Sequence, residues 1–182
     1  MATAEKPGKT AGETRLPETV LALARAMRPH QWVKNLLIFL PFVFAVGVVW
    51  SLSSLDQAPE LLIRLAVVFV ALCAVASAVY LLNDLSDRRS DQLHPVKRNR
   101  PIALGKVPVP LAVVSMAILA VAGVAVLALL SPVLVWITLA YIAINVAYSL
   151  GAKKIMLIVV LAVASGYVIR IGLGAVAIGV VP

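Results

Sequence analysis

The chain has 182 residues, of which 62% are hydrophobic and 13% are charged, and its formal net charge at pH 7 is +8. Soluble domains are usually about half apolar, and the excess here falls in long uncharged runs, which excludes an ordinary soluble domain. Backbone groups in lipid must be hydrogen-bonded within their own segment, so the sequence predicts an all-α integral membrane protein. The single cysteine and the two histidines lack the spacing of a zinc site.

The first 30 residues divide into a tail and a predicted surface helix. Residues 1–16 are small and polar, and we expect them to be disordered. Residues 17–30 predict an amphipathic helix that lies in the membrane interface. Its expected lipid-facing residues are Leu21, Ala24 and Met27, and its expected headgroup-facing residues are Arg25 and Arg28.

Five apolar runs then follow, each long enough to cross a bilayer as a helix. They cover residues 33–50, 61–82, 109–130, 132–150 and 155–180. Residues 31–182 would therefore form one transmembrane domain. The linker at Ser131-Pro132 is so short that the third and fourth spans should form an antiparallel hairpin. The longest polar segment, residues 83–108, joins the second and third spans.

The positive charge is concentrated on one side of this topology. Fourteen of the 16 Lys and Arg residues fall in residues 1–34, in residues 88–106, and at Lys153 and Lys154. The positive-inside rule places these groups and the 83–108 loop on the cytoplasmic side of the inner (plasma) membrane. Cations that flank spans do not form the soluble basic surface of a nucleic-acid-binding protein, so we expect no nucleic-acid partner.

The acidic residues are unusually clustered. Only three of the eight lie beyond Glu60, namely Asp84, Asp87 and Asp91. On a helix these three would lie within about 60° of each other, and Asn83 widens the arc to about 100°. Such like charges repel unless a cation lies between them. Oxygen ligands suit Mg²⁺, which takes one or two protein carboxylates, waters and substrate phosphates.

A basic run follows the acidic cluster. Lys97, Arg98 and Arg100 are side chains that bind phosphate oxygens. Acidic and basic groups at one membrane face favour a site for a magnesium-bound diphosphate. The alternative is a solvated helix end, in which Arg88 and Arg89 pair with the acidic residues.

Several motifs resemble those of a known family. Asn83-Asp84-x-x-Asp87-x-x-x-Asp91 resembles the first aspartate motif of the UbiA superfamily of membrane prenyltransferases. Other motifs are similar to those of the subgroup that transfers phosphoribose. These are Arg28-Pro29-x-Gln31-Trp32-x-Lys34-Asn35, His94-Pro95-x-Lys97-Arg98-x-Arg100-Pro101-Ile102-Ala103-x-Gly105, Tyr148-x-x-x-x-Lys153 and Tyr167-x-x-Arg170. The resemblance covers about residues 25–182.

This resemblance implies a reaction and a set of partners. The reaction is Mg²⁺-dependent transfer of 5-phosphoribose from phosphoribosyl pyrophosphate to a polyprenyl (decaprenyl) phosphate, with release of diphosphate. It would supply a precursor for cell-wall arabinan (arabinogalactan). Asn83, Asp84 and Asp87 would be the catalytic residues and metal ligands, and Asp91 would support them.

The remaining implied site residues bind phosphate groups. Lys97, Arg98 and Arg100 would neutralise the donor phosphates, and Lys34, Tyr148 and Lys153 would hold the acceptor phosphate. For these last three, anchoring at the membrane interface is the alternative.

The sequence also departs from the superfamily. It has no second acidic motif, because no acidic residue follows Asp91. The superfamily has about nine spans, so we expect this chain to be the amino-terminal part of such a bundle or a shortened homologue. Arg170, in the last span, is either functional or snorkels to the far interface.

Two other functions remain open. One is a prenyltransferase that uses a prenyl diphosphate and an aromatic acceptor. The other is an inactive membrane fragment that retains the metal-diphosphate half-site. Association into homo-oligomers is open for all three.

Overall fold

The computed structural model of the chain describes residues 16–51, 55–151 and 156–180. These residues fold almost entirely into helices, and one isolated bridge joins Val46 and Trp50. The helices are α1 (Leu16–Ala26), η1 (Pro29–Phe39, a 3₁₀ helix), α2 (Leu40–Phe44), α3 (Ala58–Ser86), α4 (Arg88–Leu93), η2 (Lys97–Asn99, also 3₁₀), α5 (Val109–Leu130), α6 (Pro132–Leu150) and α7 (Met156–Ala177). The predicted all-α membrane fold is confirmed. Nearly all of the predicted tail, and Lys153, lie outside the described residues.

Four helices of the described part are long and apolar enough to cross a membrane: α3, α5, α6 and α7. Two of them begin and end as predicted, at 109–130 and 132–150. Ser131 separates them and caps α6, because its hydroxyl oxygen accepts a hydrogen bond from the Val133 amide. The predicted hairpin of spans three and four is therefore present.

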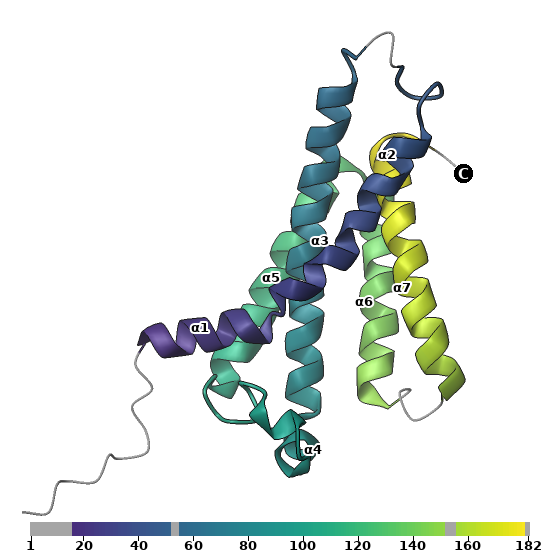
Figure 1. Cartoon of the computed structure of the whole chain (residues 1–182). Coiled ribbons are helices and arrows are strands. Elements are labelled where there is room, and N and C mark those ends of the chain that lie inside the picture. Colours follow the sequence, from purple (N-terminus) through teal and green to yellow (C-terminus); the bar gives the residue numbers. More distant parts are fainter. Residues whose placement is uncertain (1–15, 52–54, 152–155, 181–182) are drawn as a thin grey trace, which may run out of the picture.

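The first predicted span has a different form. Residues 29–44 are helical, but 11 of them form the 3₁₀ helix η1 and five form α2. At about 2.0 Å and 1.5 Å per residue, the two pieces together measure about 30 Å, close to the thickness of a hydrocarbon core. Figure 1 shows this segment running past α3 and alongside α7. Whether it makes a fifth span, as expected, stays a prediction.

The predicted end of this span at residue 50 is wrong, because the helix stops at Phe44. Gly47 has a φ of +82°, in the left-handed region that favours glycine, and it reverses the chain. The Trp50 ring then stacks on Phe42 with centroids 4.6 Å apart, and its indole N–H donates to the Phe42 carbonyl. The turn is thus fixed by tertiary packing.

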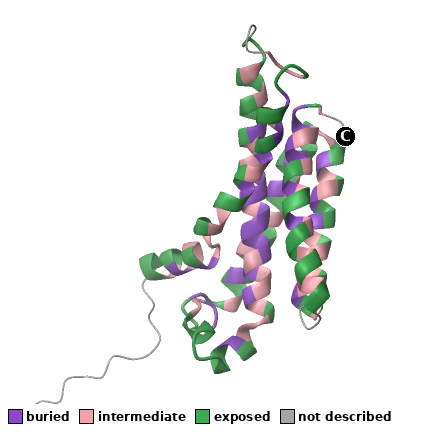
Figure 2. Ribbon diagram, turned by 45° about the vertical axis from the view of Figure 1, so that its right-hand side comes forward, coloured by how far each residue is buried: buried purple, intermediate pink, exposed green. Residues whose placement is uncertain are grey.

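The helix α3 is the centre of the bundle. It contributes more buried residues to the core than any other helix, and Figure 2 shows the buried colour running along it. Helix α5 approaches it closely at Gly123, where a β-carbon would lie 2.6 Å from a Val75 methyl and 2.7 Å from the Ala71 carbonyl oxygen. The outer faces of α5, α6 and α7 are largely exposed and apolar, which suits contact with lipid.

One end of the bundle gathers the polar segments. The carboxyl end of α3, helix α4, the end of α6 and the start of α7 lie there, and α1 projects sideways nearby (Figure 1). We call this the aspartate end. Helix α1 runs nearly across the direction of α3, an orientation that suits the expected interfacial helix.

Candidate functional site

The clustered acidic residues follow one nearly continuous helical path. Helix α3 runs past the predicted end at residue 82 to Ser86, so Asn83 and Asp84 are part of it. Asp87 separates α3 from α4, and Asp91 lies in α4. The Asp87 amide donates to the Asn83 carbonyl at 3.0 Å, and the Asp91 amide donates to the Asp87 carbonyl at 2.8 Å. The structure thus brings these residues together as the spacing predicted.

Two of the carboxylates are buried in an ion-pair network. Arg28 Nη2 donates to Asp84 Oδ1 at 2.6 Å. Arg100 Nη1 donates to Asp84 Oδ1 at 3.2 Å and to Asp91 Oδ2 at 2.7 Å. Asp84 and Asp91 are each only 2% exposed. We call these four residues the aspartate network; its two carboxylates and two guanidiniums balance in charge.

The network contradicts one alternative and one expectation. The alternative paired the acidic residues with Arg88 and Arg89, but Asp84 and Asp91 pair with Arg28 and Arg100. Arg28 does not face headgroups, because its guanidinium lies against Asp84 and 5.0 Å above the centre of the Tyr80 ring.

Arg28 reaches Asp84 through an unusual backbone turn. Its φ of 55° and ψ of 59° lie in the left-handed region, and the residue is the N-cap of η1, directly before Pro29. A residue with a β-carbon pays about 1–2 kcal/mol for this conformation. The ion pair with Asp84 offsets that cost. The sequence signal was the position of Arg28 directly before a proline, which marks a chain turn.

Asn83 connects α3 to α6. Its side-chain oxygen accepts a hydrogen bond from the Ser149 hydroxyl, with the oxygens 3.4 Å apart, and Ser149 is buried. Sequence reasoning missed Ser149, because a serine near the end of an apolar span gives no signal of its own.

Lys97 and Arg98 remain available to a ligand. Both are exposed on η2, and neither forms an ion pair with any described residue. The His94 ring nitrogen Nδ1 accepts hydrogen bonds from the backbone amides of Val96 and Lys97, at 3.2 and 3.3 Å, and so shapes this turn. Of the three predicted donor-binding cations, only Arg100 is held by carboxylates.

The acidic residues can be compared with the ligands that a magnesium ion requires. Within the described ranges, no three His, Cys, Asp or Glu side chains are close enough to hold a metal by themselves. Mg²⁺ commonly needs only one or two protein carboxylates when phosphates and waters complete its shell. Asn83, Asp84 and Asp87 supply one amide oxygen and two carboxylates, which are the kinds of donor that Mg²⁺ takes when it is bound together with a diphosphate.

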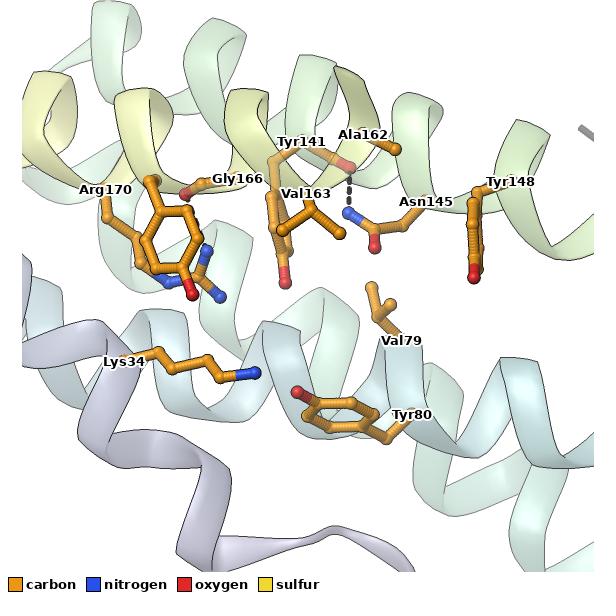
Figure 3. A pocket seen from close by; sticks show the side chains of 11 residues that line it. Lys34, Val79, Tyr80, Tyr141, Asn145, Tyr148, Ala162, Val163, Gly166 and Arg170 are labelled. Atoms are coloured by element: carbon orange, nitrogen blue, oxygen red, sulfur yellow. Dashed lines mark hydrogen bonds between the residues drawn. The ribbon is translucent and has the colours of Figure 1, made fainter. Parts of the chain in front are cut away.

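A second polar site lies inside the bundle, among η1, α3, α6 and α7. It is a cavity of about 190 Å³ that all four tyrosines of the chain line. The predicted residues Lys34 and Tyr148 contribute to it, and Figure 3 shows their side chains directed into the cavity. The other polar lining residues are Tyr80, Tyr141, Asn145, Tyr167 and Arg170. We call it the tyrosine cavity.

Arg170 does not snorkel to the far interface. It is 7% exposed, and its Nη1 donates to the Gly166 carbonyl at 2.6 Å, one turn back toward the aspartate end. Its Nε donates to Asn35 Oδ1 at 2.8 Å. The snorkelling alternative is therefore wrong. Sequence reasoning also missed Tyr80, Tyr141 and Asn145, although four tyrosines at the ends and middles of spans were a compositional signal.

Comparison with known proteins identifies the family. The sequence profile of the UbiA prenyltransferase family matches residues 39–181. The chain belongs to this family. The resemblance of its motifs is thereby confirmed.

Curated relatives narrow the similarity further. The chain is 38% identical over 173 residues to the decaprenyl-phosphate phosphoribosyltransferase of Mycolicibacterium smegmatis. This match covers 95% of the chain and 52% of that protein. It is 38% identical over 165 residues to the enzyme of that name from Mycobacterium tuberculosis, covering 90% and 53%. With the protein of that name from Corynebacterium glutamicum it shares 35% identity over 161 residues, covering 87% and 46%. The chain thus spans about half the length of the curated relatives it matches.

Proposed function

We propose that this chain takes part in Mg²⁺-dependent transfer of 5-phosphoribose from phosphoribosyl pyrophosphate to a polyprenyl phosphate. Diphosphate is released, and the product would serve cell-wall arabinan synthesis. The observation that carries the proposal is the adjacency of two polar sites in an apolar bundle. Tyr80 lines the tyrosine cavity and also lies beneath Arg28 of the aspartate network. The similarity to phosphoribosyltransferases supports the choice of donor.

The aspartate end would bind the donor diphosphate. Asn83, Asp84 and Asp87 would hold the magnesium ion, which when bound neutralises charge on the leaving diphosphate. Arg28 and Arg100 fix the position of the Asp84 carboxylate, so this group need not reorganise when the donor arrives. Asp91 supports the site by holding Arg100.

The exposed cations of η2 would bind the phosphate at the other end of the donor. Lys97 and Arg98 have no acidic partner among the described residues, unlike Arg100. A donor with a 5-phosphate carries a second anionic group, which a prenyl diphosphate lacks. We therefore assign Lys97 and Arg98 to the 5-phosphate, and Arg100 to the carboxylates.

The acceptor would approach from the tyrosine cavity. It is already an anionic phosphate, so its attack on the sugar carbon requires positioning more than a protein base. Lys34 and Tyr148 would hold this phosphate, together with Lys153, which lies outside the described residues. The acceptor oxygen and the leaving diphosphate would then meet near Tyr80.

A label-transfer experiment tests the function. Membranes that contain the chain are given a polyprenyl phosphate and phosphoribosyl pyrophosphate labelled in the ribose, and the lipid extract is counted. We expect label in the lipid fraction only when Mg²⁺ is present. Transfer instead from a labelled prenyl diphosphate to an aromatic acceptor would favour the prenyltransferase alternative. No transfer from either donor would favour the inactive fragment.

Replacement of the η2 cations should weaken donor binding selectively. Lys97→Ala or Arg98→Ala removes a charge-assisted contact to the 5-phosphate, so we expect the donor KM to rise about tenfold to a hundredfold in at least one of them. That variant should also discriminate less against a donor analogue without the 5-phosphate. Arg100→Ala should instead lower kcat, because it releases Asp84 and Asp91.

Lys106→Ala is the matched control, since Lys106 is another exposed cation of the same loop. The donor KM of this variant should stay within about twofold of the donor KM of the unmodified chain. Equal discrimination between the two donors in both η2 variants would contradict the assignment and indicate that the cations only contact headgroups.

We infer a cytoplasmic location for the aspartate end from the charge distribution. A cysteine at Ser90, exposed in α4, should react with a membrane-impermeant thiol reagent only after the inner face is opened. A cysteine at Gln57, exposed at the other end of α3, should react in intact cells. The natural Cys73 is buried and gives little background. Labelling of Ser90→Cys in intact cells would show that the aspartate end faces the outside of the cell.

A further inference from the structure

Helix α1 exposes an apolar face while another of its faces is docked on the bundle. Leu16 and Val20 are 83% and 65% exposed, and they lie about 40° apart around the helix. Ala22 and Ala26 are buried in one cluster with residues of α3 and α5. A helix that is apolar on its open side and runs across the spans suits the membrane interface (Figure 1).

A charged edge of α1 lies between these two faces. Glu18 and Arg25 are seven residues apart, so they lie within about 20° of each other around the helix and about 10.5 Å apart along it. Both are exposed. Glu18 in the first turn and Arg25 in the last turn suit the helix dipole, which explains their positions along α1. The dipole does not explain why a second cation faces this edge.

The second cation is Lys106, in the loop that precedes α5. It lines a cavity of about 130 Å³ together with residues of α1, and the lining is Glu18, Leu21, Ala22, Arg25 and Lys106. The backbone holds Lys106 in place, because its amide donates to the Pro101 carbonyl at 3.0 Å. The next residue, Val107, is buried in the same cluster as Ala22. The cavity is therefore formed by two segments that are packed against each other.

The charges around this cavity do not pair with one another. No ion pair in the part of the chain that the structure describes includes Glu18, Arg25 or Lys106. Two positive groups and one negative group are thus open to a ligand. Leu21, which is 53% exposed, adds an apolar wall on the side of Val20. A ligand that suits this lining carries an anionic group, a cationic group and hydrocarbon.

We propose that this cavity binds the headgroup of a phospholipid that carries both a phosphate and a primary amine, as phosphatidylethanolamine does. Arg25 and Lys106 bind the phosphate oxygens, which are strong acceptors for guanidinium and ammonium donors. Glu18 accepts hydrogen bonds from the amine of the headgroup. The acyl chains pass Leu21 and enter the hydrocarbon layer beside the exposed face of α1.

Two features select this headgroup over others. A primary ammonium has three N–H donors for the Glu18 carboxylate, whereas the trimethylated nitrogen of phosphatidylcholine has none and the glycerol of phosphatidylglycerol has no positive charge. A headgroup that is charged at both ends also bridges the two helical turns between Glu18 and Arg25. The site goes beyond the proposed function, because none of its residues has a role in the transfer reaction.

Lipid binding to the purified chain tests the site directly. The chain is kept in detergent micelles at low ionic strength, where surface charges are least screened. It is titrated with phosphatidylethanolamine, phosphatidylglycerol or phosphatidylcholine of identical acyl chains, and bound lipid is counted by native mass spectrometry. We expect phosphatidylethanolamine to bind about threefold to fivefold more tightly than either of the others, the effect of one exposed ion pair.

Variants of the charged edge separate the two ends of the headgroup. Arg25→Gln should weaken the binding of all three lipids about fivefold, because it removes a contact to the phosphate that they share. Glu18→Gln should remove the preference for phosphatidylethanolamine without weakening phosphatidylglycerol. Both side chains are exposed, so the helix content measured by circular dichroism should not change. Arg64→Gln and Glu60→Gln are the matched controls, an exposed cation and an exposed acid on α3, and neither should alter lipid binding.

Several results would overturn the proposal. Equal affinities for the three lipids would indicate contact with bulk lipid only, and tighter binding of phosphatidylglycerol would indicate a site for anionic lipid without a role for Glu18. A preference that persists in Glu18→Gln would place the headgroup elsewhere. Displacement by soluble glycerophosphoethanolamine at equal concentration would indicate a site for the free headgroup and not for the lipid. Since no donor, acceptor or Mg²⁺ is present, the result does not depend on phosphoribose transfer.

Discussion

Replacement of Asp84 by Asn should abolish transfer of labelled phosphoribose, a loss of at least about a hundredfold in kcat. The substitution keeps the shape of the side chain but removes the charge that Arg28 and Arg100 share and that a magnesium ion would need. It also leaves these two guanidiniums with one carboxylate in place of two. Breaking a buried pair in this way costs about 3–5 kcal/mol, so the position of α1 and of the loop near Arg100 should loosen as well.

The measurement compares membranes that contain equal amounts of each variant. Glu60→Gln is the matched control, because Glu60 is an acidic residue of the same helix, 71% exposed and paired with Arg64. Exposed pairs contribute about 0–1 kcal/mol, so this variant should retain activity. We expect Asp87→Asn to be inactive and Asp91→Asn to be milder. Near-normal turnover of Asp84→Asn at saturating Mg²⁺ would refute the assignment of the metal site.

Substitution of Gly174 by Ala should be the most destabilising small change in the bundle. The added β-carbon would collide with the Ile38 carbonyl oxygen and lie 2.8 Å from the carbonyl carbon. These are backbone atoms of η1, so no side-chain rotation can relieve the collision and η1 must move away from α7. Overpacking of this kind costs about 1–3 kcal/mol and more where the backbone must shift. Because Asn35 belongs to the same segment, its hydrogen bond to Arg170 should weaken too.

Unfolding in mixed detergent micelles, followed by circular dichroism, would measure this loss. Gly172→Ala is the control: it lies on the same helix, two residues earlier, and a β-carbon there meets nothing within 4 Å. Its free energy of unfolding should be unchanged or slightly higher, since alanine favours helix more than glycine does. Equal stability of the two variants would show that η1 and α7 do not pack as described.

The long apolar elements were predictable because they depend on local properties. Residues 109–130 and 132–150 are uncharged runs separated by Ser131, and lipid forces such runs into helices. The end at Phe44 was not predictable, because it depends on Trp50 packing on Phe42. The extension of α3 to Ser86 likewise depends on partners from elsewhere, which bury Asp84.

In the candidate site, too, features that depend on local sequence were predictable and features that depend on distant partners were not. The spacing of Asp84, Asp87 and Asp91 indicated that they would lie together, and they do. Their partners could not be predicted, because sequence reasoning assigns an arginine near a membrane to water or headgroups. Arg28 and Arg170 instead turn inward, to groups 56 and 135 residues away in sequence. Only the folded arrangement shows which cations have an acidic partner and which do not.

The separation of Arg28 from Asp84 has a consequence for biosynthesis. The two residues are 56 positions apart, and at about 5–20 residues per second a ribosome needs about 3–11 s to pass from one to the other. During that time the left-handed turn at Arg28 has no carboxylate to stabilise it. Arg100, which joins both carboxylates, emerges later still. The nascent chain must therefore insert its first segments before the aspartate end can close, and a ribosome that stalls before Asp84 leaves α1 undocked.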